Sequence, residues 1–177
     1  MKRHILPLLI FLAVCRASSA DVLETSPNAF TVESSVLVKG APDAVYAALI
    51  KPGTWWDPAH TWSGDARNLS IDARAGGCFC ETLPNGGSVE HARVIFAQPG
   101  KLLRFDAALG PFQAMPVKGV LTFSFKIEEG NTRVTVNYRV AGTFTMESAQ
   151  LAPGADGMLA GQMQRFKRFI ETGKPIP

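Results

Sequence analysis

Two alternating segments between residues 117 and 140 constrain the fold of this chain most. Apolar side chains occupy every second position of each segment, with polar residues between them, and Glu129-Gly130-Asn131 separates the two. A period of two is typical of a half-buried β-strand, and a short turn joins antiparallel neighbours. The sequence therefore predicts an antiparallel sheet with one covered face, to which these strands contribute Val117, Gly119, Leu121, Phe123, Phe125, Ile127, Val134, Val136, Tyr138 and Val140.

Further strands and two helices are expected around this pair. Residues 30–38 and 103–109 also alternate, whereas residues 21–29 show no period and are expected to form a loose leader. Proline and aspartate at Pro42-Asp43 suit the first turn of a short helix. A final helix is expected from Pro153 or Asp156 to Glu171, because Leu159, Met163, Phe166 and Ile170 fall on one helical face.

Residues 1–20 have the three parts of a secretory signal peptide. Basic residues at the start precede an apolar run over residues 5–15, and small residues Ser18 and Ala20 stand at the −3 and −1 positions of a cleavage site. We expect cleavage after Ala20, a single domain over residues 21–177, and a periplasmic or secreted protein. An alternative is a lipoprotein signal with Cys15 as the lipidated residue, although Val14 before it is bulkier than such sites usually accept.

Charge gives no indication of a nucleic-acid partner. Loss of Lys2, Arg3 and Arg16 with the signal would leave 15 basic and 15 acidic residues, so the basic character of the whole chain comes from its leader. The apolar run is too short to cross a bilayer, and we expect no integral membrane segment after cleavage. Nucleotide, hydrolase-elbow and zinc-protease motifs are absent from the sequence, and no cofactor is expected.

A hairpin is predicted over residues 69–97. Asn85-Gly86 lies between two strand-like segments, Leu69–Leu83 and Ser88–Ala97, and this dipeptide suits the positive φ angles of a tight turn. A turn centred on these two residues places Glu81 opposite Glu90 and Cys80 opposite His91. Phe79, Glu81 and Glu90 then share the inner face with Ala92, Val94 and Phe96.

This register leaves two functional hypotheses open on the hairpin. Glu81 and Glu90 facing each other inside would be an acid/base pair, because two close carboxylates push their pKa values apart; alternatively, both lie in water at the hairpin tip. On the outer face, Cys78, Cys80 and His91 would be a weak metal or redox site without a visible fourth ligand. A disulfide between Cys78 and Cys80 is not expected without a bulge, because residues two apart on a strand match its geometry poorly.

The three tryptophans, Trp55, Trp56 and Trp62, lie within eight positions. Such a cluster either closes one end of a core or forms an aromatic rim over a ligand cavity, since an indole ring combines a large apolar area with a polar N–H.

The order of these elements resembles the START-like helix-grip superfamily, also called SRPBCC, and within it the polyketide cyclase/dehydrase and Hsp90-ATPase-activator-homologue group. The resemblance covers about residues 30–170 and depends on an ordered set of short segments: residues 41–49, Trp55-Trp56, Gly76-Gly77, Glu81, residues 86–90, 99–105 and 119–123. It implies a curved antiparallel sheet of six to seven strands around a long C-terminal helix, with an apolar cavity between them. Hsp90 is not an expected partner, because an exported protein does not meet the cytosolic chaperone.

The resemblance and the apolar faces together suggest an exported binding protein for a small hydrophobic or lipid-like molecule. The alternative is a cyclase or dehydratase that uses Glu81 and Glu90. The expected cavity and mouth residues are Trp55, Trp56, Phe79, Phe96, Phe105, Phe112, Met115, Leu121, Phe123, Val136, Tyr138, Leu159 and Met163.

Overall fold

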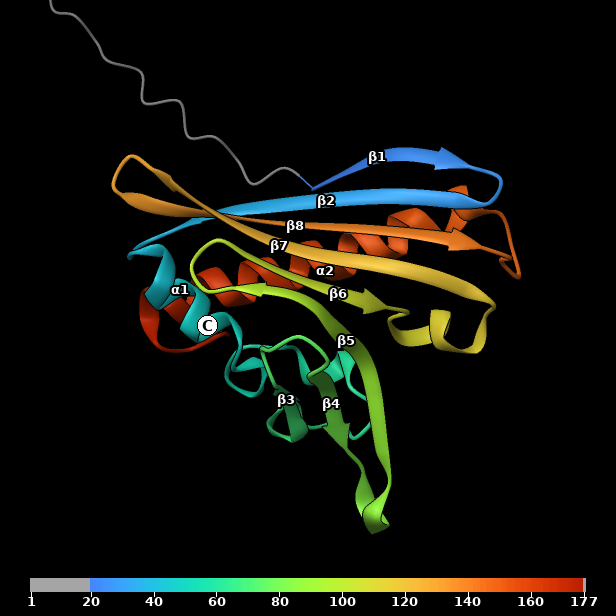
Figure 1. Cartoon of the computed structure of the whole chain (residues 1–177), viewed down its shortest axis with the longest axis horizontal. Helices are drawn as coiled ribbons and strands as arrows, with labels where there is room; N and C mark the ends of the chain where they lie inside the picture. Colours follow the sequence, from blue (N-terminus) through green and yellow to red (C-terminus); the bar gives the residue numbers. More distant parts are fainter. Residues whose placement is uncertain (1–19, 177) are drawn as a thin grey trace, which may run out of the picture.

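A computed structural model describes residues 20–176, so residues 1–19 of the predicted signal peptide, Cys15 among them, lie outside the described residues. The chain is an α+β fold with an eight-stranded antiparallel sheet and a long C-terminal helix (Figure 1). Its elements are β1 (Ala20–Ser26), β2 (Ala29–Val38), α1 (Pro42–Leu49), η1 (Pro52–Thr54), η2 (Pro58–His60), η3 (Ala66–Asn68), β3 (Leu69–Ile71), β4 (Cys78–Thr82), η4 (Pro84–Gly86), β5 (Ser88–Gln98), β6 (Leu102–Ala107), η5 (Gly110–Ala114), β7 (Val117–Glu128), β8 (Asn131–Gly142) and α2 (Ser148–Thr172).

The sheet has the order β1-β2-β8-β7-β6-β5-β4-β3. Inward residues of β2, β7 and β8 are buried at every second position over most of each strand, which confirms the predicted alternation. Ile127, predicted on the covered face, is 75% exposed near the end of β7. Helix α2 packs mainly across β2 and β1, and its Leu159, Met163 and Phe166 lie in the buried core. The predicted helix-grip class is confirmed, because a curved antiparallel sheet holds this helix on one face (Figure 1).

The strand count is higher than the sequence predicted, and β1 is one reason. Residues 21–26 are all exposed, so they show no apolar alternation, and yet the segment pairs with β2 from Ala20↔Ser34 to Ser26↔Ala29. Backbone hydrogen bonds along a sheet edge, rather than burial of side chains, stabilise this strand. The prediction of a loose leader is therefore wrong.

The second reason is that the predicted strand over residues 69–83 is two strands. The chain turns back between β3 and β4, which pair antiparallel with Leu69 opposite Glu81 and Ile71 opposite Phe79. Gly77 makes the turn possible, because a Cβ there would lie 2.0 Å from the carbonyl oxygen of Asp72. The β4–β5 hairpin then extends away from the main body of the sheet (Figure 1).

Helix α2 begins five residues before the earliest predicted start. It runs from Ser148, with Pro153 inside it, and ends at Gly173, which has a left-handed φ of 74°. Pro153 lacks the N–H that would bond to Ala149, so it costs one backbone hydrogen bond near the start of the helix. Among residues 20–176, no helix is long and apolar enough to cross a membrane.

Candidate functional site

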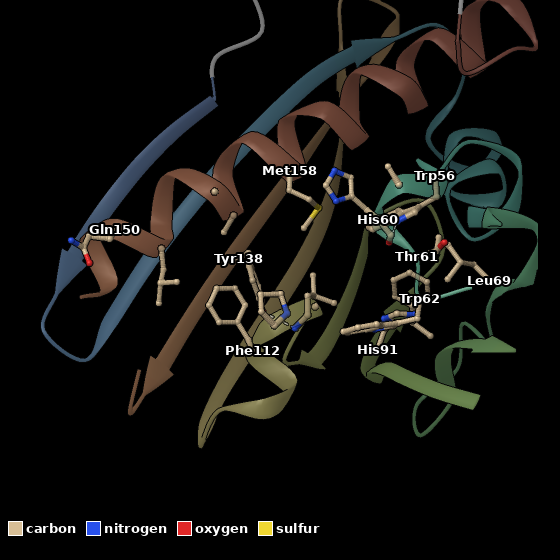
Figure 2. Close-up of a pocket in the computed structure, with 18 residues that line it drawn as sticks. Trp56, His60, Thr61, Trp62, Leu69, His91, Phe112, Tyr138, Gln150 and Met158 are labelled. Carbon is tan, nitrogen blue, oxygen red and sulfur yellow. Dashed lines mark hydrogen bonds between the residues drawn. The ribbon is translucent and has the colours of Figure 1, made fainter. Parts of the chain in front are cut away.

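A cavity of about 550 Å³ lies between α2, the inner face of the sheet and the segment that links α1 to β3 (Figure 2). Its walls are mainly aromatic and aliphatic. The aromatic members are Trp56, Trp62, Phe79, Phe112 and Tyr138, and α2 contributes Leu151, Gly154, Ala155 and Met158. His60, Trp62, Pro111 and Gln150 are exposed members of the lining and mark the opening to solvent.

The two neighbouring tryptophans have different roles. Trp55 is 1% exposed, donates its indole N–H to the carbonyl of Leu49 and packs edge-on against Phe166, so it closes the core. Trp56 donates to the carbonyl of His60, packs edge-on against Phe79 and lines the cavity. Trp55 therefore has the predicted role of closing the core, and Trp56 has the alternative role of an aromatic residue at the ligand cavity.

Helix α2 fixes the segment that carries Trp56 and His60. The buried side chain of Gln162 accepts a hydrogen bond from the backbone N–H of Asp57 over 2.9 Å. Arg165 donates to the backbone carbonyls of Trp55 and Trp56. These contacts join residues about one hundred positions apart, and so the cavity wall is held against the helix rather than left as a free loop.

A β-bulge decides which residues of the β4–β5 hairpin face the cavity. The hairpin closes between Leu83 and Gly87, and the pairing near its tip is Glu81↔Val89 and Cys80↔Glu90. Beyond a shift at Phe79/Cys80 the register returns to Phe79↔Ala92, so His91 is the extra residue of β5. Two successive residues of such a bulge can point to the same side, and His91 and Ala92 are both buried.

The bulge brings the side chain of His91 next to that of Glu81. Nε2 of His91 lies 2.9 Å from Oε2 of Glu81, and the two side chains are 8% and 0% exposed. The carboxylate also accepts hydrogen bonds from the backbone N–H groups of Trp62 (3.1 Å) and Ser63 (2.5 Å). The loop over the cavity mouth is therefore tied to the hairpin through Glu81.

Glu81 remains ionised despite its burial. Desolvation alone raises the pKa of this carboxyl, but hydrogen bonds from Ser63, Trp62 and His91 outweigh it and hold the pKa below its ordinary value. A carboxylate that accepts several N–H donors is stabilised in its charged form. The buried pair of the site is thus a carboxylate and an imidazole.

The predicted pairing of Glu81 with Glu90 is wrong. Glu90 lies opposite Cys80 on the outer face, is exposed, and forms a surface ion pair with Arg93. The prediction assumed a two-residue turn at Asn85-Gly86 and an unbroken register. The turn instead has three residues between Leu83 and Gly87, which shifts the pairing at the tip by one residue, and the bulge restores the predicted register at Phe79↔Ala92. Acid/base chemistry by these two carboxylates therefore has no geometric basis.

The predicted cluster of Cys78, Cys80 and His91 does not assemble either, because His91 faces inward. Cys78 and Cys80 form a disulfide with their Cα atoms 5.4 Å apart, within the usual range for a bridge. The bulge of β5 lies directly opposite these residues. Glu90 comes near the two sulfur atoms, but disulfide sulfurs are not the thiolates that bind zinc.

The other predicted ligand-binding residues divide into three groups. Trp56, Phe79, Phe112 and Tyr138 line the cavity. Eight residues do not line the cavity but lie in the core or pack against it: Trp55, Phe105, Met115, Leu121, Phe123, Val136, Leu159 and Met163. Phe96 faces outward and is 45% exposed, because a second register shift, at Val94/Phe96, places it opposite Arg104.

Several lining residues were missed from the sequence. Leu151 lies before the predicted start of the helix, whereas Ala155 and Met158 lie near that start, and the predicted core-facing stripe began only at Leu159. His60 and Trp62 belong to the tryptophan-rich segment. The aromatic residues there indicated a rim over a cavity, but the sequence did not show which side chains point into it. His91 was assigned to the wrong face of its strand.

No protein-family model matches this chain, and a search of curated proteins finds no relative. Solved structures do show its fold. The Aha1 dimer from Colwellia psychrerythraea is 19% identical, with a TM-score of 0.58, over 81% of this chain and 98% of that one. CalU16 from Micromonospora echinospora is 16% identical, with a TM-score of 0.60, over 92% and 88%. MLL2253 from Mesorhizobium loti is 16% identical, with a TM-score of 0.58, over 80% and 96%. At these identities the likeness concerns the helix-grip fold alone.

Proposed function

We propose that this protein binds a small, largely apolar molecule in the cavity between the sheet and α2. The observation that carries the proposal is the cavity itself: about 550 Å³, with walls that are mostly aromatic and aliphatic and few polar side chains. Ligand sites for small molecules usually have this volume and this composition. A filled core would need no opening at His60, Trp62 and Gln150.

The sequence supports two further parts of the proposal, a hydrophobic ligand and export from the cytosol. The resemblance to START-like proteins of the polyketide cyclase/dehydrase group agrees with a hydrophobic ligand, and the leader-like residues 1–20 agree with export to the periplasm or the medium. In that compartment the protein would carry or sequester its ligand outside the cytosol.

The test uses a fluorescent apolar probe and a pair of helix variants. N-phenyl-1-naphthylamine becomes bright in apolar surroundings, and titration into the purified protein should give a saturable rise. Gly154 lines the cavity, and a Cβ there meets open space, so Gly154→Trp should fill the cavity without disturbing the fold. We expect its affinity for the probe to fall by about tenfold or more, a loss of roughly 1.4 kcal/mol or more.

Gly157→Trp is the matched control. Gly157 lies on the same helix, is exposed, also has open space at its Cβ, and is not part of the lining. It should bind the probe like the unaltered protein. Absence of saturable binding to the unaltered protein, or equal binding by both variants, would refute the proposed function.

A further inference from the structure

The polar groups of the cavity wall are mostly committed to the protein itself. The hydroxyl of Tyr138 accepts from the N–H of Leu109 (3.0 Å) and donates to the carbonyl of Ala107 (3.2 Å). Thr61 donates its hydroxyl to the carbonyl of Pro58, and Trp56 donates its indole N–H to that of His60. These side chains therefore shape the cavity without offering a free hydrogen bond deep inside it.

His91 differs from them, because only one of its ring nitrogens has a partner. Nε2 faces Glu81, which is ionised and can only accept, so Nε2 carries a proton. In a neutral imidazole the other nitrogen then has a free lone pair. Across residues 21–176, no group hydrogen-bonds Nδ1, and this atom is not enclosed by protein. His91 is one of the residues that line the cavity (Figure 2).

The orientation of this ring is fixed from two sides. Glu81 holds Nε2, and Phe79 packs against the ring with the centroids 5.1 Å apart. Glu81 is itself fixed by the N–H groups of Trp62 and Ser63. A buried acceptor held in one direction within an apolar cavity selects a ligand that brings a matching donor, because a mismatched group would leave both partners without a hydrogen bond.

We propose that Nδ1 of His91 accepts a hydrogen bond from a hydroxyl group of the ligand, and that the cavity therefore selects apolar molecules that carry a hydroxyl donor. This inference rests on the proposed function, since it concerns the same cavity. His91 is the residue that distinguishes hydroxylated ligands from their ethers, and Glu81 is the positioning residue that sets the proton on Nε2.

The test compares 2-naphthol with 2-methoxynaphthalene, two probes that share one apolar body and differ in the hydroxyl proton. By calorimetric titration the unaltered protein should bind 2-naphthol about tenfold tighter or more. In His91→Phe the ratio should fall to about one, while the affinity for 2-methoxynaphthalene stays within about threefold. In Glu81→Gln the preference should fall as well, because the amide no longer fixes the proton on Nε2.

A second measurement needs no variant. The ¹⁵N resonances of the His91 ring should show Nε2 protonated and Nδ1 unprotonated, and only 2-naphthol should shift the Nδ1 resonance. Equal affinities of the unaltered protein for the two probes would overturn the inference but leave the proposed function intact. Tighter binding of 2-naphthoate than of 2-naphthol would overturn it too, since that preference requires a donor at Nδ1. If neither naphthalene probe nor N-phenyl-1-naphthylamine binds, the proposed function itself is refuted, and the inference about His91 is refuted with it.

Discussion

Strands β7 and β8 differ from strand β5 in one respect that separates scaffold from site. The β7–β8 register runs without a shift from Val117↔Gly142 to Glu128↔Asn131. Strand β5 shifts register against both of its neighbours, at Phe79/Cys80 with β4 and at Val94/Phe96 with β6. The regular strands supply most of the filled core and one cavity residue, Tyr138, whereas the irregular strand supplies the buried histidine of the cavity. In this molecule, a break in the regular pattern is what places a polar group inside an apolar wall.

The largest loss of stability is expected from a substitution in the regular strand pair β7–β8, and it tests the contrast between these strands and β5. Leu121 of β7 is 0% exposed and lies opposite Phe105 and Tyr138. Leu121→Ala should lower the free energy of unfolding by about 2–5 kcal/mol, because it removes buried methyl groups and leaves a void. Urea denaturation measures this loss. Since Leu121 does not line the cavity, the folded variant should bind N-phenyl-1-naphthylamine within about twofold of the unaltered protein.

Ser124→Ala is its control, because Ser124 lies on the same strand and on the opposite face. It should change stability by no more than about 0.5 kcal/mol. Comparable losses for the two variants would show that the alternation of β7 does not separate core from surface.

The same contrast explains how far the sequence could predict the molecule. Alternation is a local property of the side chains, so β2, β7 and β8 could be predicted together with the face that each one covers. A bulge is a property of backbone pairing between two strands. Nothing around His91 shows that one residue there is extra, and a prediction with unbroken pairing turned it outward.

The second bulge did leave a trace in the sequence. Val94-Ile95-Phe96 is a run of three apolar residues, whereas a strand with one covered face is expected to have a polar residue at every second position. The consequence is that Ile95 and Phe96 are 50% and 45% exposed. Strand β1 left no trace at all, because its pairing with β2 depends on backbone groups that every residue except proline carries in full.

An intermediate effect is expected at Glu81, whose carboxylate holds the irregular region together. Glu81→Gln should lower the free energy of unfolding at pH 7 by about 1–3 kcal/mol, because the amide NH₂ replaces an acceptor that buried donors require. The pKa of Glu81 is held below its ordinary value of 4.5, so its contribution is fully present above pH 4.5 and is lost as the pH falls through the lower folded-state pKa. The stability difference between the two proteins should therefore narrow on acidification.

Glu90→Gln is the matched control, with the same residue type on the same hairpin. Glu90 is exposed and its pair with Arg93 lies at the surface, so the loss should stay below about 1 kcal/mol. Urea denaturation at several pH values measures both variants. A constant difference for Glu81→Gln from pH 7 to pH 3, or equal losses at the two positions, would contradict the role given to Glu81.

The smallest effect is expected at Asp156 of α2, a second carboxyl that is partly removed from water but lacks the donors that Glu81 has. Its Oδ1 is buried and, within residues 21–176, has no hydrogen-bond partner; burial and then the charge of Asp21 raise its pKa above the ordinary value of 3.8. The pH dependence of stability is therefore opposite to that caused by Glu81. The folded state holds the proton of Asp156 more tightly than the unfolded state, so stability falls as the pH rises from 3.8 through the raised pKa. Asp156→Asn, with a similar helix propensity, should therefore raise the free energy of unfolding at pH 7 by on the order of 0.5 kcal/mol. The gain should vanish at pH 3, where Asp156 is itself neutral, and a gain of equal size at both pH values would mean that charge is not its cause.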